Sequence, residues 1–142
     1  MTLVLDASMT LAWVLKRNDP AEALAAAEGL DEVRASGAQV PALWYPEIAN
    51  ALLLAERQKI LTIHDSATFL AGLSMWEIVQ DAAAPAQFLT QVLYLSRSYK
   101  LTAYDATYLE LALRNSAALA TFDRPLAAAA RAAGVCVFGD PA

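Results

Sequence analysis

Residues 101–126 read "LTAYDATYLELALRNSAALATFDRPL": a helix-like segment, a short apolar run and the start of another helix-like segment. The apolar run Ala118–Phe122 is continuous rather than alternating, which is typical of a strand covered on both faces. Asp105 and Asp123 each stand where a helix-like segment begins. An aspartate at such a position commonly accepts hydrogen bonds from the unpaired N–H groups of the first turn. The two side chains therefore either only cap helices or belong to a larger set that converges in space.

The order of a buried strand followed by a helix recurs along the chain. Three more continuous apolar runs favour strands, at Thr2–Leu5, Ala38–Ala42 and Val135–Phe138. Segments rich in Ala, Leu, Glu and Gln predict helices over Met9–Lys16, Ala21–Ala35, Pro46–Lys59, Ile63–Leu73, Ala86–Tyr99, Ala103–Asn115 and Pro125–Ala133. This alternation predicts an α/β fold with a short, mainly parallel central sheet.

Length and composition limit the class of protein. With 142 residues the chain is long enough for one domain with a real core and too short for two ordinary ones, so we expect a single domain over residues 1–142. Its 58% of hydrophobic residues, beside 18% charged, predict a folded chain with an apolar patch for self-association, and hence a homodimer. The net charge of −5 disfavours nonspecific nucleic-acid binding through a broad basic face, but it permits a local groove.

No segment has the features of a membrane span or a signal peptide. The longest uncharged stretch, residues 82–96, is interrupted by one proline and two glutamines, whereas a span needs about 20 apolar residues. The N-terminal MTLVLDASM has no basic leader, and Asp6 lies within its apolar run. We therefore expect a cytoplasmic protein that does not bind membranes.

The single cysteine and the single histidine exclude two kinds of site. Cys136 cannot form an internal disulfide, and its place in the run GVCVFG predicts a buried core residue rather than a reactive thiol. His64 cannot build a multi-histidine metal site, and its first-turn position in a helix predicts a structural or surface role. Any metal site within one chain therefore uses mainly oxygen ligands.

Four carboxylates stand at strand ends or helix starts. Asp6 and Asp123 each follow a predicted strand, whereas Glu47 and Asp105 each lie in the first turn of a predicted helix. Taken singly, each is explained as a helix cap or as a negative charge at the positive end of a helix, and Thr102 with Asp105 resembles a capping box. A parallel sheet, however, brings its strand ends and the following helix starts to one edge, where ligands bind. We therefore expect the four side chains to converge.

A cluster of four carboxylates favours a bound cation. Two unit charges ~4 Å apart repel by about 4 kcal/mol at an effective dielectric constant of about 20. Hard divalent ions such as Mg²⁺ or Mn²⁺ prefer oxygen ligands and are commonly held by a few carboxylates, water and substrate phosphate. Such ions polarise a phosphoryl oxygen and generate hydroxide from bound water. Metal-dependent phosphodiester hydrolysis is therefore the leading interpretation.

The motifs around these acids resemble those of a known family. The chain is similar to PIN-domain ribonucleases, specifically the VapC-type toxins of bacterial toxin–antitoxin pairs, in the order and spacing of LVLDAS, PEIANALL, LTAYDATYLELAL and LATFDRPLAAAA. The likeness extends from Thr2 to Phe138. It implies a PIN-like three-layer α/β/α fold, RNA as substrate, one or two Mg²⁺ or Mn²⁺ ions and a cognate VapB-type antitoxin as partner.

The resemblance also implies which residues form the site. Asp6 and Asp105 match the most direct metal ligands, and Glu47 and Asp123 complete the pocket directly or through water. Thr121 matches the small polar residue before the last acidic position, where a hydroxyl could orient a carboxylate or a metal-bound water. The preference of threonine for strands explains the presence of Thr121 equally well.

Several other side chains have two explanations each. Ser8 either assists Asp6 or caps a helix. Trp13, Trp44 and Tyr45 could stack on bases, but core packing is favoured beside such apolar runs. Candidates for phosphate contact are equally explained as solvated surface charges: Lys16, Arg17, Arg57, Lys59, Arg97, Lys100 and Arg124.

Other classes of protein stay open as alternatives. An aspartate-nucleophile phosphatase would use Asp6, but the haloacid-dehalogenase type has a second aspartate where this chain has Ser8. A receiver-type signalling domain would need a late lysine, and none follows Lys100. A non-catalytic PIN-like scaffold would bind a partner through its apolar helices and use the four acids only as caps.

Overall fold

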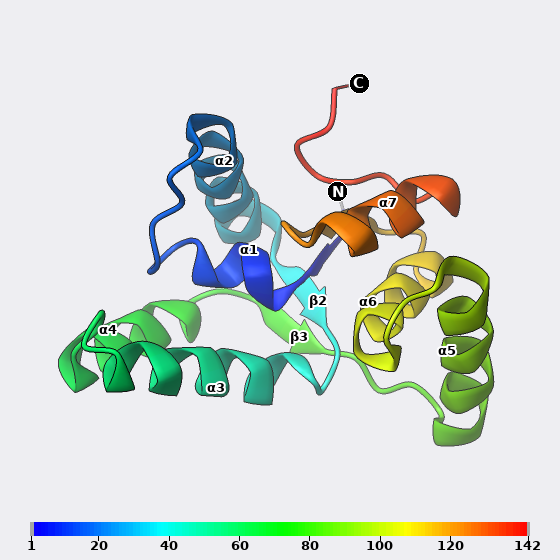
Figure 1. Cartoon of the computed structure of the whole chain (residues 1–142), viewed down its shortest axis with the longest axis horizontal. Coiled ribbons are helices and arrows are strands. Elements are labelled where there is room, and N and C mark those ends of the chain that lie inside the picture. The colour runs from blue at the N-terminus through cyan, green and yellow to red at the C-terminus, as the bar shows by residue number, and fades with distance from the viewer. Residues whose placement is uncertain (1, 142) are drawn as a thin grey trace.

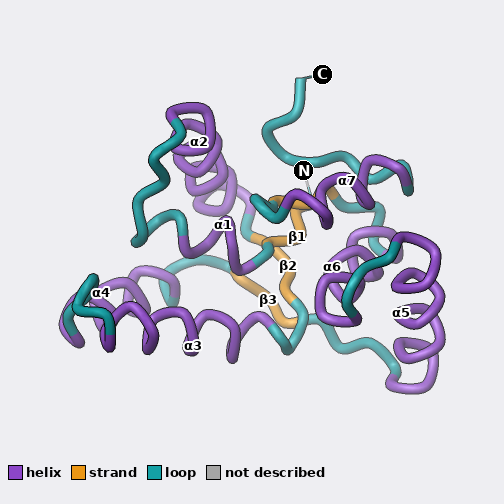
Figure 2. The backbone as a smooth tube through the Cα atoms, in the orientation of Figure 1, coloured by secondary structure: helices purple, strands orange, loops and turns teal. Residues whose placement is uncertain are grey.

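A short sheet lies at the centre of the computed structural model, which describes residues 2–141 (Figures 1 and 2). Its strand order is β3-β2-β1-β4, and each neighbouring pair is parallel. The strands have three residues each: β1 (Leu3–Leu5), β2 (Ala38–Val40), β3 (Ile78–Gln80) and β4 (Ala118–Ala120). In register, Val4 of β1 lies between Gln39 and Leu119.

Helices surround this sheet on both sides, which confirms the predicted three-layer α/β/α fold (Figure 2). Their bounds are α1 (Ala7–Leu11), α2 (Pro20–Ser36), α3 (Trp44–Arg57), α4 (Ile63–Leu73), α5 (Pro85–Tyr99), α6 (Ala103–Arg114) and α7 (Arg124–Ala132). Burial is most extensive in α6, where every residue from Ala106 to Ala112 is buried, so this part of the helix is covered on all sides. Helix α6 contacts β1, β4, α5 and α7, so it fixes Asp105 near the strand ends.

Local capping signals explain why most helix predictions were accurate. Helix α4 has the predicted bounds, because Thr62 and Asp65 form a reciprocal capping box with N–H to oxygen distances of 3.0 and 2.9 Å. Helix α1 is shorter than predicted. Residues 12–14 continue it as a tighter turn, in which each N–H donates to the carbonyl three residues earlier.

The predicted strand Val135–Phe138 is wrong, and so is the predicted burial of Cys136. The segment forms only an isolated parallel bridge between Val137 and Leu119. Val135 and Val137 are buried, whereas Cys136 between them is exposed, because successive side chains of an extended segment point in opposite directions.

The sequence prediction missed β3, and the reason is its position at the sheet edge. Val79 of β3 is 59% exposed, and Ile78 is only half-buried. The strand therefore lacks the continuous apolar run that marks a strand buried on both faces. His64 is exposed in the first turn of α4, in agreement with the predicted structural or surface role, and Val92 and Leu95 of α5 are buried. Within residues 2–141, no helix has the length and apolarity needed to cross a membrane.

Candidate functional site

The carboxyl ends of β1 and β4 bring two of the acids together. Asp6 follows β1, and its backbone N–H donates to Ala120 O at the end of β4, 3.0 Å away. Asp123 lies three residues beyond Ala120. Burial of the Asp6 carboxyl raises its pKa, and the nearby negative charge of Asp123 adds a smaller rise.

Helices α3 and α6 add the other two acids. Burial raises the pKa of Glu47, and the charges of Asp6 and Asp105 raise it further. Burial also raises the pKa of Asp105, with additional contributions from Asp123 and Asp6. The four carboxylates therefore lie close enough to repel one another, as a shared acidic site requires.

Asp6 stands at the N-cap position of α1 but does not cap it. Its carboxylate is buried, and its Oδ2 accepts hydrogen bonds from Ser8 Oγ at 2.7 Å and from Thr121 Oγ1 at 2.6 Å. The two hydroxyls also accept backbone hydrogen bonds, Ser8 from Phe122 N–H at 2.9 Å and Thr121 from Asp123 N–H at 3.0 Å. Ser8 and Thr121 thus orient Asp6 and attach the loop after β4 to α1.

Glu47 has a partner that sequence reasoning missed. The hydroxyl of Tyr108 on α6 donates a hydrogen bond to Oε1 of Glu47 on α3. Tyr108 follows Asp105 by three residues, a spacing that puts both on one face of a helix. That spacing was the sequence feature that could have identified Tyr108. The neighbouring residues in the sequence are mostly apolar, however, so Tyr108 resembles an ordinary core residue.

Helix capping explains part of the role of Asp123 but not why Asp123 and Asp105 lie near each other. Asp123 Oδ1 accepts a hydrogen bond from Leu126 N–H at 2.9 Å and so caps α7. The cap of α6 is Thr102, whose Oγ1 accepts a hydrogen bond from Asp105 N–H at 3.1 Å, so only the Thr102 half of the predicted capping box forms. The charge of Asp123 raises the pKa of Asp6 and that of Asp105 raises the pKa of Glu47, so both aspartates lie near the other acids, and Asp123 does so while it caps α7.

The chemistry of the site fits a hard divalent cation. In the described chain, the ion pairs that the structure shows involve other acids, and none of the four has a basic partner. No three His, Cys, Asp or Glu side chains within residues 2–141 are arranged to hold one ion directly. Mg²⁺ needs fewer direct ligands, because it keeps several waters and is usually bound through one or two carboxylates. The oxygen donors therefore fit Mg²⁺ or Mn²⁺ bound partly through water.

In the absence of metal, we expect the protein to lose stability as the pH rises above the ordinary carboxyl pKa values of 3.8 and 4.5. Asp6, Glu47 and Asp105 have raised pKa values, so the folded protein holds protons that the unfolded chain has released. The free-energy cost of ionising these carboxyls in the folded protein is absent at pH values below the pKa values of the unfolded chain. It is fully present at pH values above the pKa values of the folded protein. Melting temperatures in chelator from about pH 5 to about pH 8 test this. A rising melting temperature over that range would contradict it.

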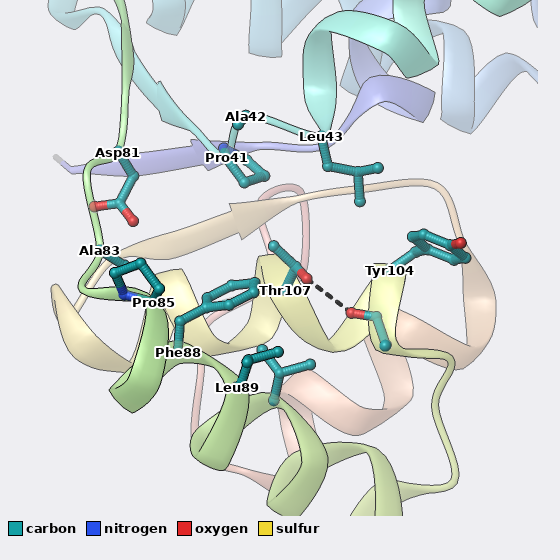
Figure 3. A pocket seen from close by; sticks show the side chains of 12 residues that line it. Pro41, Ala42, Leu43, Asp81, Ala83, Pro85, Phe88, Leu89, Tyr104 and Thr107 are labelled. Carbon is teal, nitrogen blue, oxygen red and sulfur yellow. Dashed lines mark hydrogen bonds between the residues drawn. The ribbon is translucent and has the colours of Figure 1, made fainter.

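An apolar pocket lies beside α6, the helix that also carries Asp105. It has a volume of about 450 Å³ and lies between the β2–α3 loop, the β3–α5 loop, α5 and α6. Figure 3 shows Phe88 and Leu89 of α5 facing Leu43 and Tyr104 across it. Tyr104 in its lining precedes Asp105 in the sequence, but the described lining residues include none of the four acids. Asp81 at its border is neutralised by Arg114, whose Nη1 and Nη2 donate to it at 2.9 and 2.6 Å.

The aromatic and basic candidates have mainly structural or surface positions. Trp13 Nε1 donates to Ala26 O at 2.9 Å, and the buried Trp44 donates to Thr10 Oγ1 at 3.1 Å, whereas Tyr45 is 44% exposed. Arg17 pairs with a glutamate and stacks over an aromatic ring. The other basic candidates are exposed: Lys16, Arg57, Lys59, Arg97, Lys100 and Arg124.

Comparisons with known proteins agree with this fold. The family model described as PIN domain matches residues 3–132. No curated protein sequence matches the chain. The crystal structure of PAE2754 from Pyrobaculum aerophilum is 24% identical, with a TM-score of 0.67 over 91% of this chain and 79% of that chain.

Two further structures resemble nearly the whole chain. FitAcB from Neisseria gonorrhoeae is 20% identical, with a TM-score of 0.55 over 97% of this chain and 96% of that chain. FitAB bound to an IR36 DNA fragment is 22% identical, with a TM-score of 0.56 over 97% and 94%. Such likenesses indicate a shared fold. Because the family model spans most of its length, this chain belongs to the PIN domain family.

Proposed function

We propose that the chain, folded as one domain over residues 1–142, is a Mg²⁺- or Mn²⁺-dependent endoribonuclease and the toxin of a VapC-type toxin–antitoxin pair. The observation that carries this proposal is the meeting of four carboxylates at one sheet edge, with no basic partner among residues 2–141. Membership of the PIN family, whose members are generally metal-dependent nucleases, supports it.

Each side chain has a distinct task in this proposal. Asp6 and Asp105 hold the ion, and Glu47 and Asp123 complete the site directly or through water. Thr121 and Ser8 fix the Asp6 carboxylate through their hydroxyls. When bound, the ion supplies polarisation of a phosphoryl oxygen and a hydroxide nucleophile at neutral pH.

The proposed partners are an RNA substrate, a second copy of the chain and a VapB-type antitoxin, all in the cytoplasm. Exposed apolar side chains on α5, including Leu89 and Leu93, support association with other proteins. FitAB, which has the same fold, has been seen bound to DNA. An antitoxin could silence the site by placing an Arg or Lys among the carboxylates, which would displace metal and offset their repulsion.

The paired variants Asp105→Asn and Asp123→Asn test whether these acids do more than cap helices. Asparagine caps about as well as aspartate, so capping alone predicts no change in stability or cleavage. We expect Asp105→Asn to melt at or above the parent temperature in chelator, because one charge of a repelling group is removed. Asp105→Asn should also lose the stabilisation by Mn²⁺ and the cleavage of RNA. Asp123→Asn should change the melting temperature, the Mn²⁺ stabilisation and the cleavage in the same directions but by smaller amounts.

The measurement is a pair of melting curves, in chelator and in excess Mn²⁺, beside a cleavage assay on the same preparations. Metal-induced shifts and cleavage that equal those of the parent in both variants would return the two aspartates to helix capping. A parent protein that is neither stabilised by Mn²⁺ nor active on RNA would instead favour the non-catalytic scaffold.

A further inference from the structure

Tyr108 is a fully buried residue whose hydroxyl lies inside the acidic site. Its relative exposure is 0%, although it carries a polar group. The hydroxyl donates to Glu47 Oε1. One phenol thus connects α6 to α3, the two helices that carry Asp105 and Glu47.

Hydroxyl groups engage one oxygen of each of two carboxylates. Tyr108 engages Oε1 of Glu47, while Ser8 and Thr121 both engage Oδ2 of Asp6. In each acid the other oxygen has no hydroxyl partner among the described residues, so it is the oxygen most available to a cation. Ca²⁺ has six to eight ligands and readily takes both oxygens of one carboxylate, whereas Mg²⁺ requires a near-octahedral shell of single oxygens and waters. Mn²⁺ also suits an octahedral set of oxygens.

We propose that Tyr108 is a positioning residue that holds Glu47 to single-oxygen ligation and thereby makes the site select Mg²⁺ and Mn²⁺ over Ca²⁺. This inference rests on the metal-dependent function proposed above. Glu47 is only half-buried and its side chain has several rotatable bonds, so without a fixed partner it would reorient to give a larger ion both oxygens.

Tyr108→Phe removes the hydroxyl and keeps the ring. Removal of a residue that hydrogen-bonds a metal-binding side chain typically lowers metal affinity about 10–100-fold. We expect the Mn²⁺ concentration that gives half of the thermal stabilisation to rise about tenfold, with a smaller change for Ca²⁺. The preference for Mn²⁺ over Ca²⁺ should therefore fall. Melting temperatures measured against increasing MnCl₂, MgCl₂ or CaCl₂, without RNA, provide the readout.

Two further variants separate positioning from simple packing. Tyr99→Phe removes a hydroxyl from a half-buried tyrosine of α5 outside the site, and it should keep the parental preference. Glu47→Asp keeps the charge but withdraws the carboxylate from Tyr108, and it should lower the preference as Tyr108→Phe does. A purely structural role of Tyr108 would lower the melting temperature in chelator without moving the ion preference.

The outcomes also separate this inference from the proposed function. An unchanged preference for Mn²⁺ over Ca²⁺ in Tyr108→Phe and Glu47→Asp, with a parent that binds Mn²⁺, overturns the role of Tyr108 alone. A parent that no divalent ion stabilises overturns the metal-dependent function, and the role of Tyr108 with it.

Discussion

Asp6→Asn is expected to reduce RNA cleavage by about a thousandfold, because metal polarisation of a phosphoryl oxygen contributes several kcal/mol and each 1.36 kcal/mol is a factor of ten in rate. The variant should still fold. The amide oxygen of asparagine can accept the hydrogen bonds that Ser8 and Thr121 now donate to Asp6 Oδ2. Because Asp6 is buried beside other carboxylates, a neutral side chain removes a desolvated negative charge. In chelator, Asp6→Asn should therefore melt at or above the parent temperature.

The matched control is Asp31→Asn, the same chemical change at an exposed position of α2. It should leave both cleavage and Mn²⁺-induced stabilisation at parental values. Cleavage by Asp6→Asn at the parental rate, in preparations from which contaminating nuclease has been removed, would show that the reaction does not use this carboxylate. A loss of cleavage accompanied by unfolding would indicate a structural role.

Gly37→Ala is expected to destabilise the protein by about 3 kcal/mol, and hence to lower the melting temperature by about 10 °C. Gly37 links α2 to β2 with φ of 73° and ψ of −171°, a region that is essentially restricted to glycine. A Cβ on Gly37 would also lie 2.5 Å from the carbonyl oxygen of Glu77. That oxygen accepts the N–H of Ala38 at 2.9 Å, so the clash would separate β2 from β3.

Gly134→Ala shows what a positive φ costs at a position where an added Cβ meets no neighbouring atom. Gly134 also has positive φ, 81°, but a Cβ there would meet no atom within 4 Å. Its substitution should therefore cost only about 1 kcal/mol, the typical price of a left-handed conformation for an L-residue. Chemical denaturation of both variants gives the comparison. Equal losses would show that the contact with Glu77 relaxes without cost.

The candidate site could be predicted from the sequence only in part. Asp6 and Asp123 directly follow strands that are continuous apolar runs, so their position at one sheet edge follows from local pattern and parallel topology. The hydrogen bond between Tyr108 and Glu47 spans 61 residues and depends on how α3 packs against α6. Periodicity within either helix carries no information on that packing.

Local sequence is enough to predict the alternation of strands and helices, the helix starts at capping residues such as Thr62, and the placement of four acids at element ends. These features depend on interactions between residues close in the chain. The strand β3, in contrast, follows from long-range pairing, because its hydrogen bonds come from β2 while its side chains stay largely exposed. The tertiary structure also decided that Cys136 faces outward, and that hydroxyls of Ser8, Thr121 and Tyr108 hold the acids. Such contacts join segments far apart in the chain, and their geometry is fixed by the packing of the whole core.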